Sequence, residues 1–150
     1  MSQAKAEVHR LGECLGPSPR FHIPYLRSLA VLAAWDEQKE QAIGHLREAA
    51  QLAADLGLPG EQWQVQAALG TLYDTSGEPA QARIAFGEAT RIIQGLAEGI
   101  SDEALRTRFL AGPQIQPVLQ HVRSETFQVL RDQAKPSGAP RHLVLWADEL

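Results

Sequence analysis

Hydrophobic and polar residues follow one another along this chain with the three- and four-residue spacing of α-helices, and one spaced set of positions occurs twice. The two copies lie 40 residues apart, and small residues stand at matching places in both. Because each copy spans two helical segments joined by a polar turn, the pattern predicts a repeat of helix pairs. The repeated positions are Leu29, Ala30, Ala33, Ala42, Leu46 and Ala49 in the first copy and Leu69, Gly70, Tyr73, Ala82, Phe86 and Ala89 in the second.

The fold class that this pattern predicts is all-α, an antiparallel helix-pair solenoid with about six to seven helices. Glycine, proline and polar residues mark where each helix stops. Gly57 is expected in the left-handed conformation after a helix, and Pro79 in the first turn of the next one. Helices are expected over residues 3–15, 22–34, 39–56, 61–75 and 79–98.

Small residues at the repeated positions indicate close contacts between helices. Two helices approach closely only where one presents a side chain no larger than a methyl group. Ala30 and Gly70 would supply that point on the first helix of each pair, and Ala42 and Ala82 on the second. A glycine inside a helix costs about 0.5–1 kcal/mol relative to alanine, so we expect a close contact to compensate at Gly70.

The pattern of capping and apolar residues after residue 100 predicts that the repeats end there. Ser101 is expected as an N-cap, Leu105, Phe109 and Leu110 form an apolar stripe, and Gly112-Pro113 stops that helix. A last helix over residues 115–131 is expected to fold back as a cap through its apolar residues, which are Val118, Leu119, Val122, Phe127 and Leu130.

These segments divide the chain into five parts. We expect an N-terminal helix in 1–20 that ends a preceding repeat or acts as a cap, repeats in 21–59 and 60–99, and capping helices in 100–133. Residues 134–150 are expected to be a flexible tail after a Pro- and Gly-rich linker. The final apolar run, HLVLWADEL, either frays or docks as a helix turn or a strand.

The second copy, ALGTLYDTSGEPAQARIAFGEA (68–89), resembles a tetratricopeptide repeat, which has Leu-Gly and Tyr on its first helix and Ala, Phe or Tyr, and Ala on its second. The first copy (29–49) resembles it less closely, because Ala33 stands at the aromatic position. The 40-residue spacing is similar to that of repeats in the C-terminal part of bacterial ATPase-containing regulators, such as the transcriptional activator of maltose genes. The resemblance covers roughly residues 5 to 120 and implies a bacterial signal-transduction role, although the chain has no nucleotide-binding module.

Charge and cysteine content narrow the choice of partners and compartment. The net charge of −4, with no run of basic residues, gives no reason to expect direct contact with nucleic acid. The longest apolar run is too short to span a membrane, and the N-terminal residues lack the apolar core of a signal peptide. A single cysteine, Cys14, suits a reducing compartment and is expected to be a small buried hydrophobic residue. We therefore expect a cytoplasmic protein.

Catalytic chemistry is not expected, and neither is a cofactor or a metal ion. The sequence has no GxxxxGK loop, no GxSxG or HExxH motif and no paired cysteines. Its histidines are spread without the spacing of metal ligands. Trp35 and Trp63 are expected to be packing residues near helix ends, and an exposed tryptophan there would instead suit a binding surface. The histidines are His9, His22, His45, His121 and His142.

The resemblance implies that the first helix of each pair lines a concave binding surface. The candidate partner-binding groove would then be formed by Arg27, Val31, Gln64, Ala67, Thr71 and Asp74, with Ala34 beside them. The predicted function is a non-catalytic protein–protein interaction or scaffold module that binds a protein or peptide. The alternative is a structural, self-associating domain that completes its array by homo-oligomerisation, because solenoids generally need about three repeats.

Overall fold

The computed structural model describes residues 2–14, 16 and 18–134, and every regular element among them is helical. There are seven α-helices and one short 3₁₀ turn in this part of the chain. The helices are α1 (Ser2–Cys14), α2 (His22–Trp35), α3 (Lys39–Asp55), α4 (Pro59–Thr75), α5 (Pro79–Glu98), α6 (Glu103–Leu110) and α7 (Gln116–Ala134), with η1 (Pro19–Phe21) before α2. The all-α prediction is therefore confirmed.

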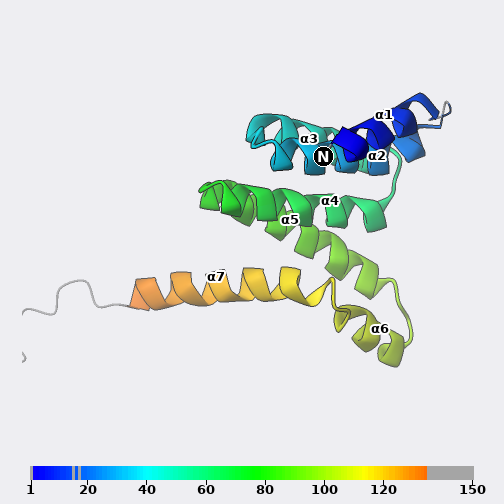
Figure 1. The fold of residues 1–150 in the computed structure, drawn as a ribbon. Coiled ribbons are helices and arrows are strands. Elements are labelled where there is room, and N and C mark those ends of the chain that lie inside the picture. Colours follow the sequence, from blue (N-terminus) through cyan, green and yellow to red (C-terminus); the bar gives the residue numbers. More distant parts are fainter. Residues whose placement is uncertain (1, 15, 17, 135–150) are drawn as a thin grey trace, which may run out of the picture.

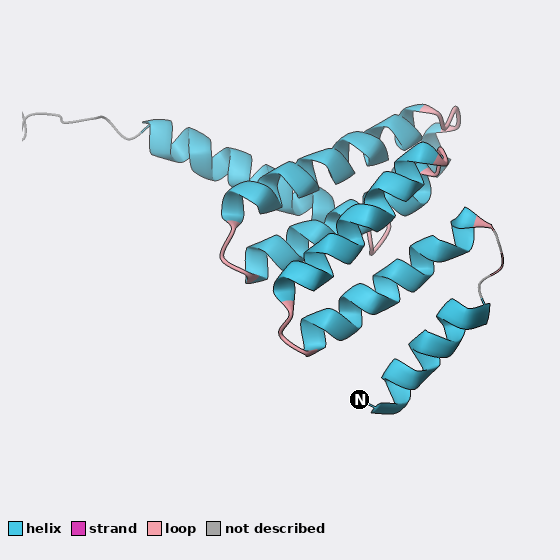
Figure 2. Cartoon of the chain, turned by 90° about the horizontal axis from the view of Figure 1, so that it is seen from above, coloured by secondary structure: helices cyan, strands magenta, loops and turns pink. Residues whose placement is uncertain are grey.

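Helices α1 to α5 pack in chain order, each mainly on its neighbours, and the largest contacts join α2 to α3, α3 to α4 and α4 to α5. Because short turns join neighbouring helices from α2 to α5, these neighbours run antiparallel, as Figure 2 shows. The α6–α7 segment forms a further layer below α4 and α5 in Figure 1. Helix α7 packs on α5.

Three of the turns have the same geometry and recur every 20 residues. Glu37, Gly57 and Gly77 all have a positive φ, of 60°, 65° and 78°. In each turn the next residue donates its backbone N–H to the carbonyl five residues earlier, at 2.8–2.9 Å, which is the Schellman arrangement that closes a helix. The left-handed conformation predicted for Gly57 is confirmed. Glu37 adopts the same conformation without being a glycine.

The left-handed turn does not recur at the fourth position of this 20-residue series, residue 97. Residue 97 is an alanine, and α5 continues through it to Glu98, so that α5 has 20 residues where α3 and α4 have 17. Helix α6 then begins after Asp102, whose carboxylate accepts a hydrogen bond from the backbone N–H of Leu105 at 2.9 Å. The prediction of Ser101 as the N-cap was therefore wrong by one residue. Asp102 has the extended backbone of an N-cap and also favours the helix dipole.

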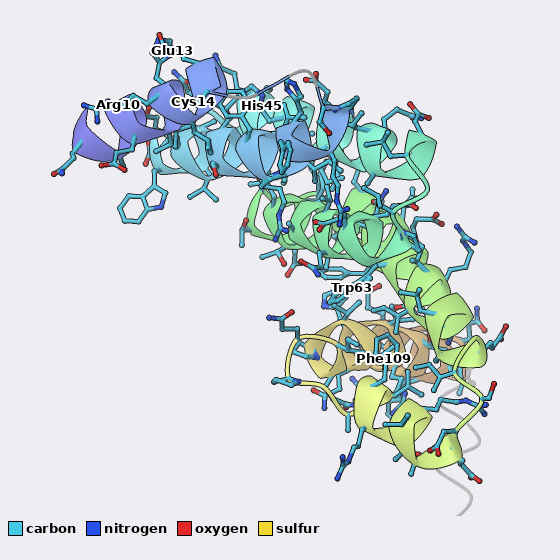
Figure 3. The ribbon with its side chains drawn as sticks, turned by 90° about the vertical axis from the view of Figure 1, so that its right-hand side faces the viewer. Arg10, Glu13, Cys14, His45, Trp63 and Phe109 are labelled. Atoms are coloured by element: carbon cyan, nitrogen blue, oxygen red, sulfur yellow. The ribbon has the colours of Figure 1, made fainter. Side chains whose placement is uncertain are left out.

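The core runs through the contacts between successive helices, and nearly all repeated positions lie in it. Eleven of the twelve are buried and Leu29 is half-buried. The chain's largest fully buried side chains are Ile23, Val65 and Ile93. Trp63 is also buried, and it extends from α4 toward the layer that holds Phe109 (Figure 3). Alanine supplies much of this core, as the scarcity of aromatic residues requires.

The C-terminal helices fit the cap prediction only in part. Leu105 is exposed and α6 has no buried residue, so the stripe over this helix buries only parts of Phe109 and Leu110. In α7, Val118 and Leu119 are buried, whereas Phe127 and Leu130 are exposed. Only the first half of α7 covers the core, since every residue from 126 to 134 is exposed. The expectations for residues 135–150 lie outside the described residues.

Candidate functional site

Five of the six predicted groove residues, all except Gln64, line one continuous surface that crosses from α2 over α4 to α7. Its first part, which we call the α2–α4 groove, has a cavity volume of about 350 Å³. It contains Arg27, Val31 and Thr71 of the predicted set. The complete lining is Arg27, Ala30, Val31, Ala34, Leu46, Ala68, Thr71, Leu72 and Thr75.

The second part, which we call the α4–α7 hollow, has a cavity volume of about 410 Å³ and holds the predicted Ala67, Thr71 and Asp74. Thr71 and Ala68 line both parts, so the two are continuous. The other wall comes from the turn before α7 and from its first half. The complete lining is Ala67, Ala68, Thr71, Asp74, Phe86, Gln114, Pro117, Val118 and His121.

Arg27 links α2 to α4 at one end of this surface. Its guanidinium donates a hydrogen bond to the side-chain oxygen of Gln64 at 3.2 Å and lies 3.9 Å from the carboxylate of Glu61. The predicted groove residues Arg27 and Gln64 therefore contact each other. Part of their hydrogen-bonding capacity is used within the fold, so neither is a fully free anchor for a ligand.

The hydroxyl groups of the groove are also engaged within the chain. Thr71 donates to the carbonyl of Ala67 and Thr75 donates to that of Thr71, both at 3.1 Å. These are local side-chain bonds along a helix, and they leave the methyl groups of both threonines free to face the groove. The wall of α4 is consequently built mostly from methyl groups and short aliphatic side chains.

Two exposed apolar side chains lie on the face of α2 that borders the groove: Val31 belongs to the groove lining, and Trp35 follows it one helical turn later. Val31 is 57% exposed and Trp35 is 71% exposed. They are four residues apart on α2, and Arg27 is one turn before them, so that all three lie along one face of the helix. The expectation that Trp35 packs in the core was wrong. Because Trp35 falls in the last turn of α2, its ring extends beyond the layer that buries Ala30 and Ala33.

Sequence reasoning missed the contribution of α7 to this surface. His121 stacks on Phe86 with ring centroids 4.0 Å apart, and its Nε2 atom lies 3.5 Å from the carboxylate of Glu125. No repeat pattern continues past Gly112-Pro113, so nothing in the spacing placed these residues beside α4. Five residues between α6 and α7 let α7 turn back onto Phe86.

A separate hollow of about 410 Å³ lies between α3 and α5 over α4. Four glutamines line it, and the Arg47 guanidinium carbon lies 5.8 Å from the centre of the Tyr73 ring. Ile84 stands on its rim and is 68% exposed. This surface shares none of the predicted groove residues. It therefore offers matched control positions for experiments on the groove.

No group of three metal-ligating side chains occurs in the part of the chain that the structure describes. Cys14 is exposed on α1 beside Glu13 (Figure 3), so the expectation that it is buried was wrong. Helix α1 contacts the rest of the chain through one face only, and Cys14 lies in its last turn. Among the described residues, no helix combines the length and apolar character needed to cross a bilayer.

Comparison of the chain with protein-family models, with curated proteins and with solved structures gave no match.

Proposed function

We propose that this chain is a non-catalytic protein–protein interaction module that holds a protein or peptide segment on the α2–α4 groove. The observation that carries the proposal is the pair of exposed side chains on one face of α2: Val31, which lines the groove, and Trp35, one helical turn beyond it. An exposed tryptophan beside a shallow apolar groove is the usual composition of a binding hot spot. Alanine and threonine walls allow a partner backbone to approach closely.

The proposal extends to the architecture and setting of the module. We propose that the helix pairs form a tetratricopeptide-like solenoid that serves as the sensor or scaffold end of a bacterial, cytoplasmic signalling or transcription regulator. The 40-residue repeat, the burial of matching positions and the close Gly70–Phe86 contact support this architecture. The regulatory setting follows from the resemblance of residues 5–120 to the repeats of bacterial ATPase-containing regulators.

Selection from a displayed library of random peptides tests the binding function. Peptides enriched on the wild-type protein should lose most of their affinity for Val31→Arg and Trp35→Ala, and should keep it for Ile84→Arg. Val31 and Ile84 are both exposed aliphatic residues, so the two arginine variants carry the same risk to folding. Equal binding to all three variants would exclude the groove, and the absence of any enriched peptide would count against an interaction module.

Self-association is the second candidate, and the same exposed side chains favour it. A second copy that covers Val31 and Trp35 would remove two large apolar groups from water, worth about 1.5–3 kcal/mol for each fully buried side chain. Light scattering coupled to size exclusion distinguishes the two functions. A dimer that dissociates in Trp35→Ala would support homo-oligomerisation, whereas a wild-type monomer leaves the groove open to another partner.

A further inference from the structure

The second half of α7 presents an apolar face that no described element covers. Val122 is half-buried, and Val129 and Leu130, two turns further along the same side of the helix, are exposed. Phe127 is also exposed but lies on another side of α7 and outside the groove. A groove with a cavity volume of about 420 Å³ separates this half from α5. We call it the α5–α7 groove, and its lining is Arg83, Gly87, Val122, Glu125, Thr126, Val129, Leu130 and Gln133.

We propose that residues 141–150 of the same chain occupy the α5–α7 groove by folding back along α7 as a short antiparallel helix. The sequence RHLVLWADEL places Leu143, Trp146, Ala147 and Leu150 at positions i, i+3, i+4 and i+7. This spacing puts all four on one helical face. Val144 and Leu145 fall outside that face and serve as controls.

The connection has a suitable length. Six residues, 135–140, separate Ala134 from Arg141, which is within the usual range of loops between antiparallel helices. Pro136, Gly138 and Pro140 favour a turn there over a continued helix. Ten helical residues span about 15 Å, so the segment would reach back as far as the level of Glu125 and Thr126.

Charge complementarity sets the antiparallel orientation. Arg141 and His142 would begin beside Asp132, near the end of α7. Asp148 and Glu149 would arrive near Arg83, whose Nε lies 4.0 Å from Glu125 and whose side chain is 53% exposed. A guanidinium at that position can donate hydrogen bonds to a second carboxylate from its other N–H groups.

Covalent linkage favours this occupant over a second copy. A short flexible linker gives an effective concentration in the millimolar range, well above that of another molecule in a dilute solution. A second copy would also have to supply an apolar segment of its own, and residues 141–150 are the apolar segment that each copy carries outside the described residues. The proposal is independent of the function assigned to the α2–α4 groove.

Hydrogen exchange on the full chain, followed by mass spectrometry, tests the proposal. Amides in 142–150 should exchange at least about tenfold more slowly than expected for unfolded chain, and Val129→Ser/Leu130→Ser should remove that protection. Leu105→Ser is the matched control, because Leu105 is equally exposed but lies on α6. In the reciprocal experiment, Leu143→Ser/Trp146→Ser should speed exchange in residues 126–133, and Val144→Ser/Leu145→Ser should not.

Each other outcome overturns the proposal. Wild-type amides in 142–150 that exchange at the unfolded rate would show an empty groove. Protection that rises with protein concentration, together with a dimer by light scattering, would assign the groove to a second copy. Loss of protection in Leu105→Ser as large as in the α7 variant would show that the segment docks elsewhere.

Discussion

The ring of Phe86 occupies the space that a Cβ atom on Gly70 would need. A Cβ built at Gly70 would lie 2.7 Å from both Cδ2 and Cε2 of that ring. At the matching positions of the first repeat, Ala30 carries a methyl group and Leu46 replaces the aromatic ring, and both are buried. The two pairs therefore divide a similar volume differently: a glycine accompanies the larger partner and an alanine the smaller one.

Gly70→Ala should destabilise the protein, even though alanine is the better helix former. The gain in helix propensity is about 0.5–1 kcal/mol, while forcing a methyl group against the ring costs about 1–3 kcal/mol. We expect a net loss of about 1–2 kcal/mol in the free energy of unfolding, measured by urea denaturation.

Phe86→Leu supplies the control for this contact, because it recreates the Ala30–Leu46 pair when combined with Gly70→Ala. In that background Gly70→Ala should become neutral or stabilising, with a coupling energy of about 0.5–3 kcal/mol in a double-mutant cycle. Additive effects of the two changes would mean that the cost at Gly70 does not come from the Phe86 ring.

Glu37→Gly should stabilise the protein. Glu37 has the left-handed backbone that Gly57 and Gly77 adopt in the equivalent turns, and this conformation costs a residue with a Cβ about 1–2 kcal/mol. Part of the gain is offset by the greater freedom of glycine in the unfolded chain, so we expect about 0.5–1 kcal/mol from urea denaturation.

The opposite change tests the same turn geometry. Gly77→Ala should destabilise by about 1 kcal/mol, since it introduces a Cβ at a φ of 78° in a turn with open space around it. Gly44→Ala, on the surface of α3, is the control and should be neutral or slightly stabilising, because open space surrounds it and its φ is not positive. A loss of stability in Glu37→Gly would contradict the strain assigned to that residue.

Most of what the sequence alone could predict about the fold came from the repeat. The limits of α5 were predicted correctly, and α2, α3 and α4 within two residues, because proline, glycine and polar turns mark their ends. The register also identified Gly70 as a place of close contact. The predicted groove residues lie together because the first helices of both copies carry them.

Residues other than the repeated positions were predicted less well, for physical reasons. Trp35 and Cys14 belong to helix ends that extend beyond their neighbours, and no local spacing encodes where a neighbour stops. The α7 wall of the binding surface depends on how the chain turns after Gly112-Pro113. The left-handed turn at Glu37 was missed because glycine is the usual signal for that conformation.

The Glu88–Arg91 pair predicts a measurable shift in a surface carboxyl group. Arg91 donates two hydrogen bonds to Glu88, at 2.6 Å and 3.0 Å. These bonds lower the pKa of Glu88 below its ordinary value of 4.5; desolvation opposes them in part, and the guanidinium charge adds the smallest effect, which also lowers the pKa. Carbon-13 NMR titration of the Glu88 carboxyl should detect the lowered pKa directly.

The sign of the stability effect follows from this direction. A carboxyl whose pKa is lower in the folded state adds stability above its unfolded pKa and loses it as the pH falls through the folded value. Arg91→Gln should therefore return the Glu88 pKa toward 4.5 and remove this small contribution at neutral pH. Arg47→Gln, on α3, should leave the Glu88 titration unchanged. A Glu88 pKa at or above its ordinary value in the wild type would contradict the pair.

Ala82→Leu tests the tightest point of the second helix pair. Ala82 is fully buried in the first turn of α5, as the matching Ala42 is in α3, so three additional carbons have no space to enter. Overpacking should lower the free energy of unfolding by about 1–3 kcal/mol, measured by urea denaturation.

Ala80→Leu is the matched control, because Ala80 lies in the same turn of α5 and is exposed. It should change stability by less than about 0.5 kcal/mol. Equal effects of the two substitutions would show that Ala82 is not a close-packing position, and the repeat register drawn through Ala42 and Ala82 would then be wrong.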